Sequence, residues 1–297
     1  MINKAAEKIL NIVREEHARK VETVSEARER LEVFYLQFRS KLDIVVEPFF
    51  IGHIPAFWIS APDASKDHAI LFFHGGSFMV GSTNDHLDLC GKLSRSAGCR
   101  VLSVDYRLAP EHIFPAALND CIASYLWLIE TGHSPSLIIP VGISAGGNLT
   151  LSMLMKLRAA GIPLPKAAVC ISPAVDITSR EETVEKNTGN DWISKEDLGL
   201  PRRIYLRKHD AKDPLVSPTY GDLRHFPPLF IQAGTHETLF DDVSAFVEKA
   251  KKAGVNVTFD VWEGMFHCWQ IFSSMLPEGQ QAIDNIGMFI KKILKTG

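Results

Sequence analysis

The sequence predicts an α/β protein in which helices cover both faces of a mostly parallel β-sheet. Two observations support this class: short strand-like runs recur along the chain, and helical stretches separate them. Strands that alternate with helices are typical of parallel sheets, because each crossover between parallel strands needs a connection about as long as a helix. A chain of 297 residues fits one such domain with a small addition.

Each expected strand is a short run of apolar and β-branched residues between turn or helix signals. These runs cover residues 44–50, 54–59, 69–73, 101–105, 137–143, 167–172, 229–233 and 255–262. Helices are expected between and after them, at 116–130, 149–160, 244–253 and 280–294. The stretch 178–212 is rich in charge and has no strong strand pattern, so we expect it to be a segment inserted between two strands.

Two helices are expected ahead of the first strand, and the second has the clearer signals. Thr23 and Glu26 have the spacing of a capping box at its start. Its apolar residues then fall on one face at helical spacing. They are Val24, Ala27, Leu31, Phe34, Tyr35 and Phe38. Such a stripe either packs on the core or covers a substrate pocket, and the spacing alone favours neither.

Composition excludes several classes of function. The net charge of −3 gives no electrostatic reason to bind nucleic acid or an anionic membrane. No apolar run reaches the roughly 18 residues that a membrane helix needs, and the N-terminus lacks the apolar core of a signal peptide, so a cytoplasmic protein is expected. Five irregularly spaced cysteines predict neither a disulfide framework nor a metal or redox pair, and the histidines lack metal-ligand spacing. We therefore expect no metal and no organic cofactor.

The strongest chemical motif is Gly142-Ile143-Ser144-Ala145-Gly146, which follows one expected strand and precedes a helical run. The pattern Gly-x-Ser-x-Gly in a strand–turn–helix context is that of a nucleophile elbow. Such a turn holds its serine in a strained backbone conformation, and only glycine-sized neighbours at 142 and 146 avoid collisions there. Ser144 is therefore the candidate nucleophile.

A second motif, 74–78, follows the expected strand 69–73 and contains Gly75 and Gly76. Acyl transfer to a serine places negative charge on the carbonyl oxygen, which needs preorganised N–H donors. Two adjacent glycines leave their backbone N–H groups accessible, and the N–H of Ala145 can act as a third donor. The pattern predicts an oxyanion hole formed by Gly75, Gly76 and Ala145.

A serine hydroxyl is a weak nucleophile until a base takes its proton. The base is expected on a loop after the last strand, and His267 is the one histidine beyond the strand 255–262. His267 is therefore the candidate base.

The histidine needs a carboxylate that orients it, and the loop after strand 229–233 offers Glu237, Asp241 and Asp242. The pattern within this loop favours Glu237, because the two aspartates are expected in the helix that follows. Serine, acid and histidine then follow one another in the chain order that hydrolases with a nucleophile elbow use.

Together these motifs resemble those of the hormone-sensitive-lipase-like esterases, the bacterial family IV branch of the α/β-hydrolases. Residues 74–78 are similar to the family's oxyanion motif, 103–112 match a second hallmark nearly residue for residue, and 144–149 match a third. The similarity covers roughly residues 40–295. Around 265–270 the sequence looks most similar to acetyl-esterases and to monoterpene ε-lactone hydrolases.

The resemblance implies an α/β-hydrolase fold, with a mostly parallel eight-stranded sheet, flanking helices and a helical cap. The catalytic domain would comprise 43–177 and 213–297, and the cap would comprise the N-terminal helices in 1–42 and the insert 178–212. The apolar stripe of the second helix would then cover the pocket. Its expected lining residues are Phe34, Trp192 and Tyr205.

The resemblance also implies a triad of Ser144, Glu237 and His267, because the family's acid lies about thirty residues before its histidine. Three positions depart from the common pattern of the family. Glu237 stands where aspartate is usual, Ile143 where many members carry aspartate, and Ser77 where many carry a third glycine.

The implied activity is that of a serine carboxylesterase that hydrolyses short- to medium-chain acyl esters of small molecules through an acyl-enzyme. A lactone hydrolase or an amidase would use the same triad and remains an alternative. A non-catalytic ligand-binding homologue is another, but the plant gibberellin receptors that resemble this family lack the catalytic histidine, and His267 is present here. The resemblance further implies a homodimer formed through the edge strand 255–262.

Overall fold

The computed structural model describes residues 4–178 and 189–295, and within them eight strands form a single sheet. The strands are β1 (Val45–Ile51), β2 (Ile54–Ser60), β3 (Ser65–Phe73), β4 (Cys99–Val104), β5 (Ile138–Ile143), β6 (Ala168–Ile171), β7 (Leu229–Gly234) and β8 (Val257–Trp262). Each lies where the sequence predicts one, and the largest difference is that β3 begins at Ser65 rather than at residue 69. The expected fold class is confirmed.

Strand order determines where the predicted motifs meet. The order across the sheet is β1-β2-β4-β3-β5-β6-β7-β8. β1 and β2 pair antiparallel to their neighbours, whereas the pairs from β4 to β8 are all parallel. The loops that follow β3, β5, β7 and β8 therefore leave the sheet at the same edge, which is where open parallel sheets bind ligands.

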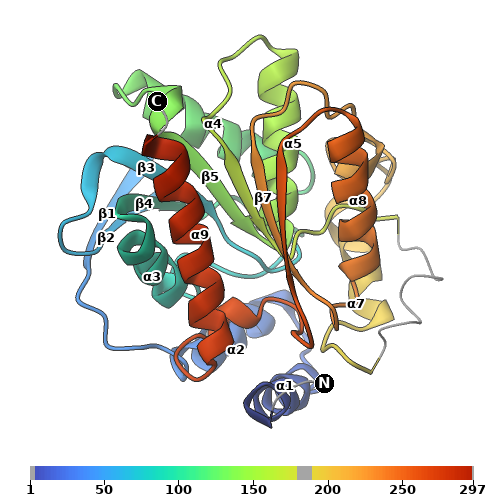
Figure 1. Cartoon of the computed structure of the whole chain (residues 1–297). Coiled ribbons are helices and arrows are strands. Elements are labelled where there is room, and N and C mark those ends of the chain that lie inside the picture. Colours follow the sequence, from blue (N-terminus) through green and yellow to red (C-terminus); the bar gives the residue numbers. More distant parts are fainter. Residues whose placement is uncertain (1–3, 179–188, 296–297) are drawn as a thin grey trace.

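Helices cover both faces of the sheet (Figure 1). They are α1 (Lys4–His17), α2 (Val24–Leu36), α3 (Leu87–Ala97), α4 (Ala116–Glu130), α5 (Ala145–Ala159), α7 (Lys195–Leu200), α8 (Phe240–Lys252) and α9 (Pro277–Lys295). α3 and α9 share one apolar cluster, α4 packs with part of α5 in a second, and α8 packs with another side of α5 in a third. Each face of the sheet thus has its own core.

Several helices differ from the sequence prediction, among them α5 and α3. α5 begins at Ala145, directly after Ser144, rather than at residue 149. α3 was not predicted, although the parallel pair β3–β4 needs a crossover at this point. Its sequence includes Gly91 and several polar residues that are nevertheless buried, such as Lys92 and Ser94, which obscures the helical periodicity.

The N-terminal helices α1 and α2 lie at the lower end of the molecule in Figure 1, together with α7 from the inserted segment. Thr23 caps α2 by accepting a hydrogen bond from the Glu26 N–H at 3.1 Å. The Glu26 carboxylate accepts from the Glu22 N–H at 2.8 Å, one residue earlier than in a standard capping box. Residues 179–188 of the expected insert lie outside the described residues.

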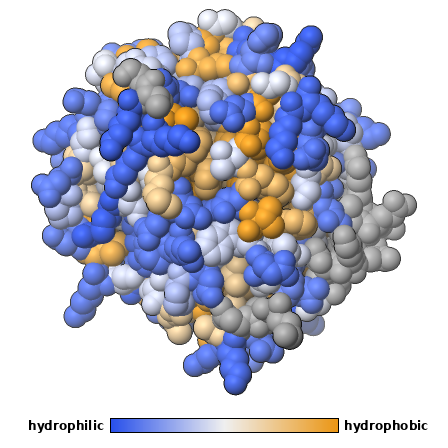
Figure 2. Space-filling view, in the orientation of Figure 1, coloured by the Kyte–Doolittle hydropathy of each residue, from blue (hydrophilic) through white to orange (hydrophobic). Residues whose placement is uncertain are grey.

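Figure 2 shows hydrophilic side chains over most of one face, with apolar residues in smaller patches between them. Among the residues described, none of the helices is both long and apolar enough to cross a bilayer.

The packing of α3 on α9 gives a test of the fold. A Cβ added at Gly287 of α9 would lie 2.5 Å from the carbonyl carbon and oxygen of Ser96 in α3. Gly287→Ala should therefore push the two helices apart and lower the free energy of unfolding by about 1–3 kcal/mol. The neighbouring Met288 is 61% exposed, so Met288→Ala is the control and should change stability by less than about 0.5 kcal/mol. Denaturant unfolding of both variants measures this, and equal stabilities would contradict the predicted overlap.

Candidate active site

The turn after β5 has the geometry that the Gly-x-Ser-x-Gly motif predicts. Ser144 has φ 54° and ψ −115°, a conformation that is strained for a residue with a side chain. A Cβ at Gly142 would collide with the backbone carbonyl of Gly146, and a Cβ at Gly146 would collide with that of Phe73. The two glycines are therefore required by the close approach of the backbone around the serine.

Three side chains from three loops meet at this turn. The Ser144 Oγ lies 2.9 Å from His267 Nε2, and His267 Nδ1 lies 3.0 Å from Glu237 Oε2. The other oxygen of Glu237 accepts hydrogen bonds from the Gly234 N–H at 2.6 Å and from the Ser172 hydroxyl at 2.8 Å. Glu237 and His267 are buried, so their mutual contact is shielded from water.

The two aspartates that the sequence offered as alternatives occupy another position. Asp241 and Asp242 lie in the first turn of α8, where a negative charge is favourable at the helix N-terminus. Within the described chain, Glu237 is the carboxylate that contacts the His267 ring.

Burial and mutual contact shift the pKa values of this pair. Burial raises the pKa of Glu237, although its hydrogen bond with His267 works in the opposite direction. Burial lowers the pKa of His267, whereas contact with the neighbouring Cys268 and with the Glu237 carboxylate raises it, and the pKa of His267 lies above its ordinary value of 6.5. Cys268 next to it is a neutral thiol, because burial raises its pKa. The imidazole can accept a proton only above its raised pKa.

The predicted oxyanion donors are not equivalent. Gly75 packs against Ser144, since an added Cβ would lie 3.4 Å from the Ser144 Cβ. Its N–H, however, donates to His86 Nε2 at 3.4 Å. In the described part of the chain, the N–H groups of Gly76 and Ala145 have no such partner. The structure therefore distinguishes the three predicted donors, because the Gly75 N–H is directed at His86 and the other two are not.

The state of His86 explains this contact. Burial lowers the pKa of His86 to about 3, so its ring is neutral near pH 7. Its Nδ1 lies 3.1 Å from the Ser82 carbonyl oxygen and must carry the proton, which leaves Nε2 as an acceptor for the Gly75 N–H. No sequence motif marks this histidine, which begins α3 twelve residues after His74.

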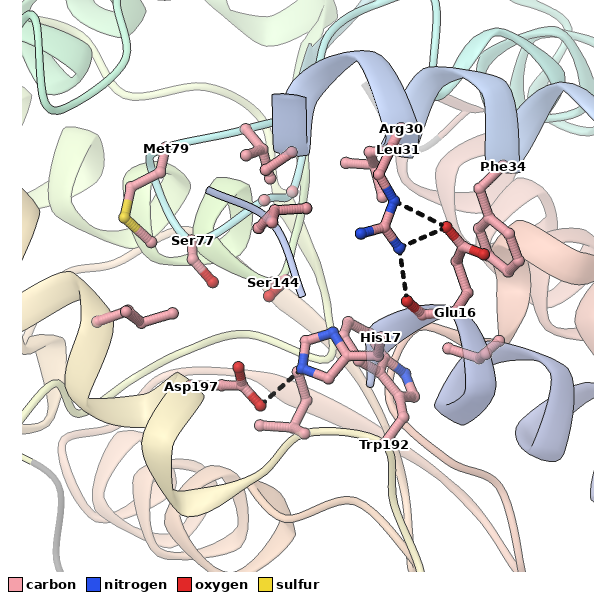
Figure 3. A pocket seen from close by; sticks show the side chains of 18 of the residues that line it. Glu16, His17, Arg30, Leu31, Phe34, Ser77, Met79, Ser144, Trp192 and Asp197 are labelled. Carbon is pink, nitrogen blue, oxygen red and sulfur yellow. Dashed lines mark hydrogen bonds and ion pairs between the residues drawn. The ribbon is translucent and has the colours of Figure 1, made fainter. Parts of the chain in front are cut away.

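A cavity of about 490 Å³ opens beside Ser144 and His267, and Figure 3 shows its walls. The apolar stripe of α2 faces it through Val24, Ala27, Leu31, Phe34 and Tyr35. Phe38, beyond the end of α2, lies in the core instead. Most of the stripe therefore lines the cavity, and Phe34 belongs both to the cavity wall and to the core cluster. A smaller cavity of about 40 Å³ also contacts Ser144 and His267.

The expected lining residues divide into two groups. Phe34 and Trp192 line the large cavity. Tyr205 does not, because its ring is buried and stacks on Phe78 with 4.2 Å between ring centroids. The turn that contains it, Pro201–Leu206, directs the tyrosine into the core beneath the 74–78 loop.

Two ion pairs in the cavity wall were not predicted from the sequence. Arg30 of α2 pairs with Glu16 of α1 at 2.8 Å, and His17 of α1 pairs with Asp197 of α7 at 2.9 Å (Figure 3). The hydrogen bond with Asp197 raises the pKa of His17. These contacts join the N-terminal helices to each other and to the inserted segment.

Comparison with known proteins defines the class to which this fold and site belong. Residues 70–271 match the family model described as alpha/beta hydrolase fold. The chain is 40% identical over 248 residues to an acetyl-hydrolase of Streptomyces hygroscopicus, covering 83% of both chains. It is 36% identical over 228 residues to an esterase of Acinetobacter venetianus, covering 76% of this chain and 75% of the relative.

The structural comparison narrows the class further. The chain superposes with a TM-score of 0.96 on the crystal structure of an esterase from the bacterial hormone-sensitive lipase family, at 40% identity and over 99% of both chains. The chain therefore belongs to the α/β-hydrolase fold family and, within it, to the esterases of the hormone-sensitive-lipase-like branch. The resemblance drawn from the motifs is confirmed.

The pair Glu237–His267 gives a prediction about pH. The variant Glu237→Gln removes the carboxylate that raises the pKa of His267, so that pKa should fall. The base is active only when neutral, and the acid limb of kcat/KM should therefore move to lower pH. kcat should fall about 10⁴-fold, because the amide no longer stabilises the imidazolium.

The control for this variant is Asp242→Asn on α8, which should leave both the limb and kcat unchanged. Steady-state kinetics from pH 4 to 10 measure the effect. An acid limb that stays in place in Glu237→Gln, with kcat within tenfold of wild type, would contradict the assignment.

Proposed function

We propose that this enzyme hydrolyses short- to medium-chain acyl esters of small molecules, with Ser144 as nucleophile, His267 as base and Glu237 as the orienting acid. The observation that carries the proposal is the unbroken series of contacts at the cavity wall. The serine Oγ lies 2.9 Å from one nitrogen of the imidazole, and the other nitrogen lies 3.0 Å from the carboxylate. Both distances are within the reach that proton transfer requires.

In the proposed acylation step, the Ser144 Oγ attacks the ester carbonyl carbon while His267 Nε2 takes the hydroxyl proton. The carbonyl oxygen becomes negative, and the free N–H groups of Gly76 and Ala145 stabilise it. The tetrahedral intermediate then collapses, and the alcohol leaves with the proton from His267. Glu237 stabilises the imidazolium and fixes which nitrogen faces the serine.

Deacylation repeats the sequence with water as the nucleophile. His267 takes a proton from the water as its oxygen attacks the acyl carbon, and the same N–H groups stabilise the second oxyanion. The acid is released when the proton returns to Ser144, which restores the resting enzyme. Gly75 assists by its size, since a side chain there would crowd Ser144.

The sizes of the two cavities support a preference for esters in which one of the two substituents is small. The cavity of about 490 Å³ has the size of many small-molecule sites, and the segment of α2 facing it is apolar. The cavity of about 40 Å³ has room for only a few atoms and also contacts Ser144 and His267. An ester carries two substituents on its carboxyl group, so one bulky and one small group fit this arrangement. The relatives named acetyl-hydrolase and esterase agree with such substrates.

A series of p-nitrophenyl esters with acyl chains of two to sixteen carbons tests the proposal. Wild type should show its highest kcat/KM on short chains and lose activity on the longest, because the walls formed by α1, α2 and α7 limit the space beside the serine. Ser144→Ala should form no acyl-enzyme and lose about 10⁶-fold in kcat.

Circular dichroism should show that Ser144→Ala remains folded, and a fluorophosphonate should label wild type but not the variant. Turnover near the wild-type rate in Ser144→Ala would overturn the assignment of the nucleophile. Labelled wild type that cleaves lactones but none of the linear esters would favour the lactone hydrolase alternative.

A further inference from the structure

One carboxylate of the inserted segment lies between the loops that carry Glu237 and His267. Asp191 is buried, with 5% of its surface exposed. Its Oδ1 accepts a hydrogen bond from the His267 backbone N–H at 2.9 Å, and its Oδ2 accepts one from the Thr238 backbone N–H at 2.8 Å. Thr238 directly follows Glu237 in the chain. The two oxygens of one side chain therefore hold the backbone on both sides of the histidine–carboxylate contact.

The backbone carbonyl of His267 is bound by Trp192, the residue that follows Asp191. Trp192 Nε1 donates to the His267 carbonyl oxygen at 2.9 Å, and the indole ring lies 5.6 Å from the imidazole ring. Both polar groups of the His267 peptide backbone are thus bound by consecutive residues of the inserted segment.

Other contacts between the two loops lie further from the reactive side chains. The His236 N–H donates to the Met265 carbonyl at 3.1 Å, and the Gly264 N–H donates to the Thr235 hydroxyl at 2.9 Å. These bonds join the loops near the strand ends. Asp191 joins them at the residues that position the triad.

Asp191 is itself held by the N-terminal helix. Arg14 of α1 donates to the Asp191 carbonyl oxygen from both Nε and Nη2, each at 3.1 Å. His17, one turn further along α1, packs edge-on against Trp192 at 5.3 Å. A series of contacts therefore runs from α1 through Asp191 to the backbone of His267.

We propose that Asp191 is a positioning residue that fixes His267 relative to Glu237 and Ser144, and through which the placement of α1 and the inserted segment controls the rate of the chemical step. This inference rests on the proposed role of His267 as the base. Asp191 does not contact the serine, and it acts through the two loops that it joins. Its negative charge also adds to burial in raising the pKa of Glu237.

Two physical arguments give the expected size of the effect. Removing the carboxylate leaves buried backbone N–H groups without their acceptor, and the loops must shift to find another. A shift of about 1 Å at a catalytic group can cost about 100-fold in rate. A carboxylate suits this place because it has only acceptors, whereas an asparagine would turn its NH₂ group toward one of the N–H donors.

The experiment compares Asp191→Ala, Asp191→Asn and the control Glu196→Ala with wild type on p-nitrophenyl acetate. Glu196 is an exposed acid of the same segment. kcat should fall about 100-fold in Asp191→Ala, with little change in KM, and less in Asp191→Asn, which keeps one acceptor oxygen. Glu196→Ala should match wild type. Arg14→Ala should lower kcat in the same direction, because it loosens the backbone of Asp191 from α1.

Two further readouts separate positioning from a general loss of structure. The melting temperature of each variant shows the range over which it stays folded, and all kinetics are measured well below that temperature. The downfield proton resonance of His267 Nδ1–H reports its bond to Glu237, and it should shift or broaden in Asp191→Ala but not in Glu196→Ala. An unchanged resonance and kcat, or a loss confined to KM, would overturn the inference.

If Asp191→Ala does not fold, Asp191→Asn tests the positioning role of Asp191 instead. A wild-type kcat in Asp191→Asn would overturn that role. The rate of fluorophosphonate labelling distinguishes a failure of the proposed function from a failure of the proposed role of Asp191. Wild type that is not labelled would refute the proposed function itself. Wild type that is labelled at the same rate as both Asp191 variants would refute only the role of Asp191.

Discussion

The strained turn at Ser144 is the constraint on which the rest of the site depends. Its positive φ is tolerated because β5 is fixed by parallel pairing on both sides and α5 begins at the next residue. The conformation directs the serine away from the sheet, toward the loops that follow β7 and β8. Those loops come from neighbouring parallel strands, so their residues reach the serine without a long connection. The fold places the three side chains at one edge of the sheet. The two glycines of the turn allow neighbouring backbone segments to lie close to each other around the serine.

A second constraint is the burial of charge beside that turn. Glu237 is fully buried, and an isolated carboxylate there would be strongly disfavoured. One oxygen is satisfied by the Gly234 N–H and the Ser172 hydroxyl and the other by His267, so the longer side chain that replaces the usual aspartate finds a partner for each oxygen. Within the described residues, Glu237 is the carboxylate in direct contact with the His267 ring, and Asp191 is the carboxylate that contacts the His267 backbone.

The sequence predicted those features that leave a local signal. Strands appear as short apolar runs, and the turn at Ser144 appears as two glycines at a fixed spacing, because collisions between nearby backbone atoms impose both. Residues that act across the fold leave no such pattern. Asp191 lies 76 residues from the histidine that it holds, and the contact between Gly75 and His86 depends on how α3 begins. Tyr205 was misplaced because an aromatic residue suits a pocket wall and a core equally well.

The N-terminal helices combine two kinds of contact with different consequences. Their polar contacts reach well-defined partners: Arg28 forms a two-point contact with Glu111, and Arg14 binds the backbone of Asp191. Their apolar stripe instead faces the cavity, where part of its surface meets no other side chain. Hydrogen bonds fix direction and distance, whereas apolar contact depends mainly on the area removed from water. Polar contacts therefore fix how these helices lie, while the buried apolar residues of α1 anchor them in the core cluster. An apolar group that entered the cavity would gain binding free energy by covering the stripe of α2.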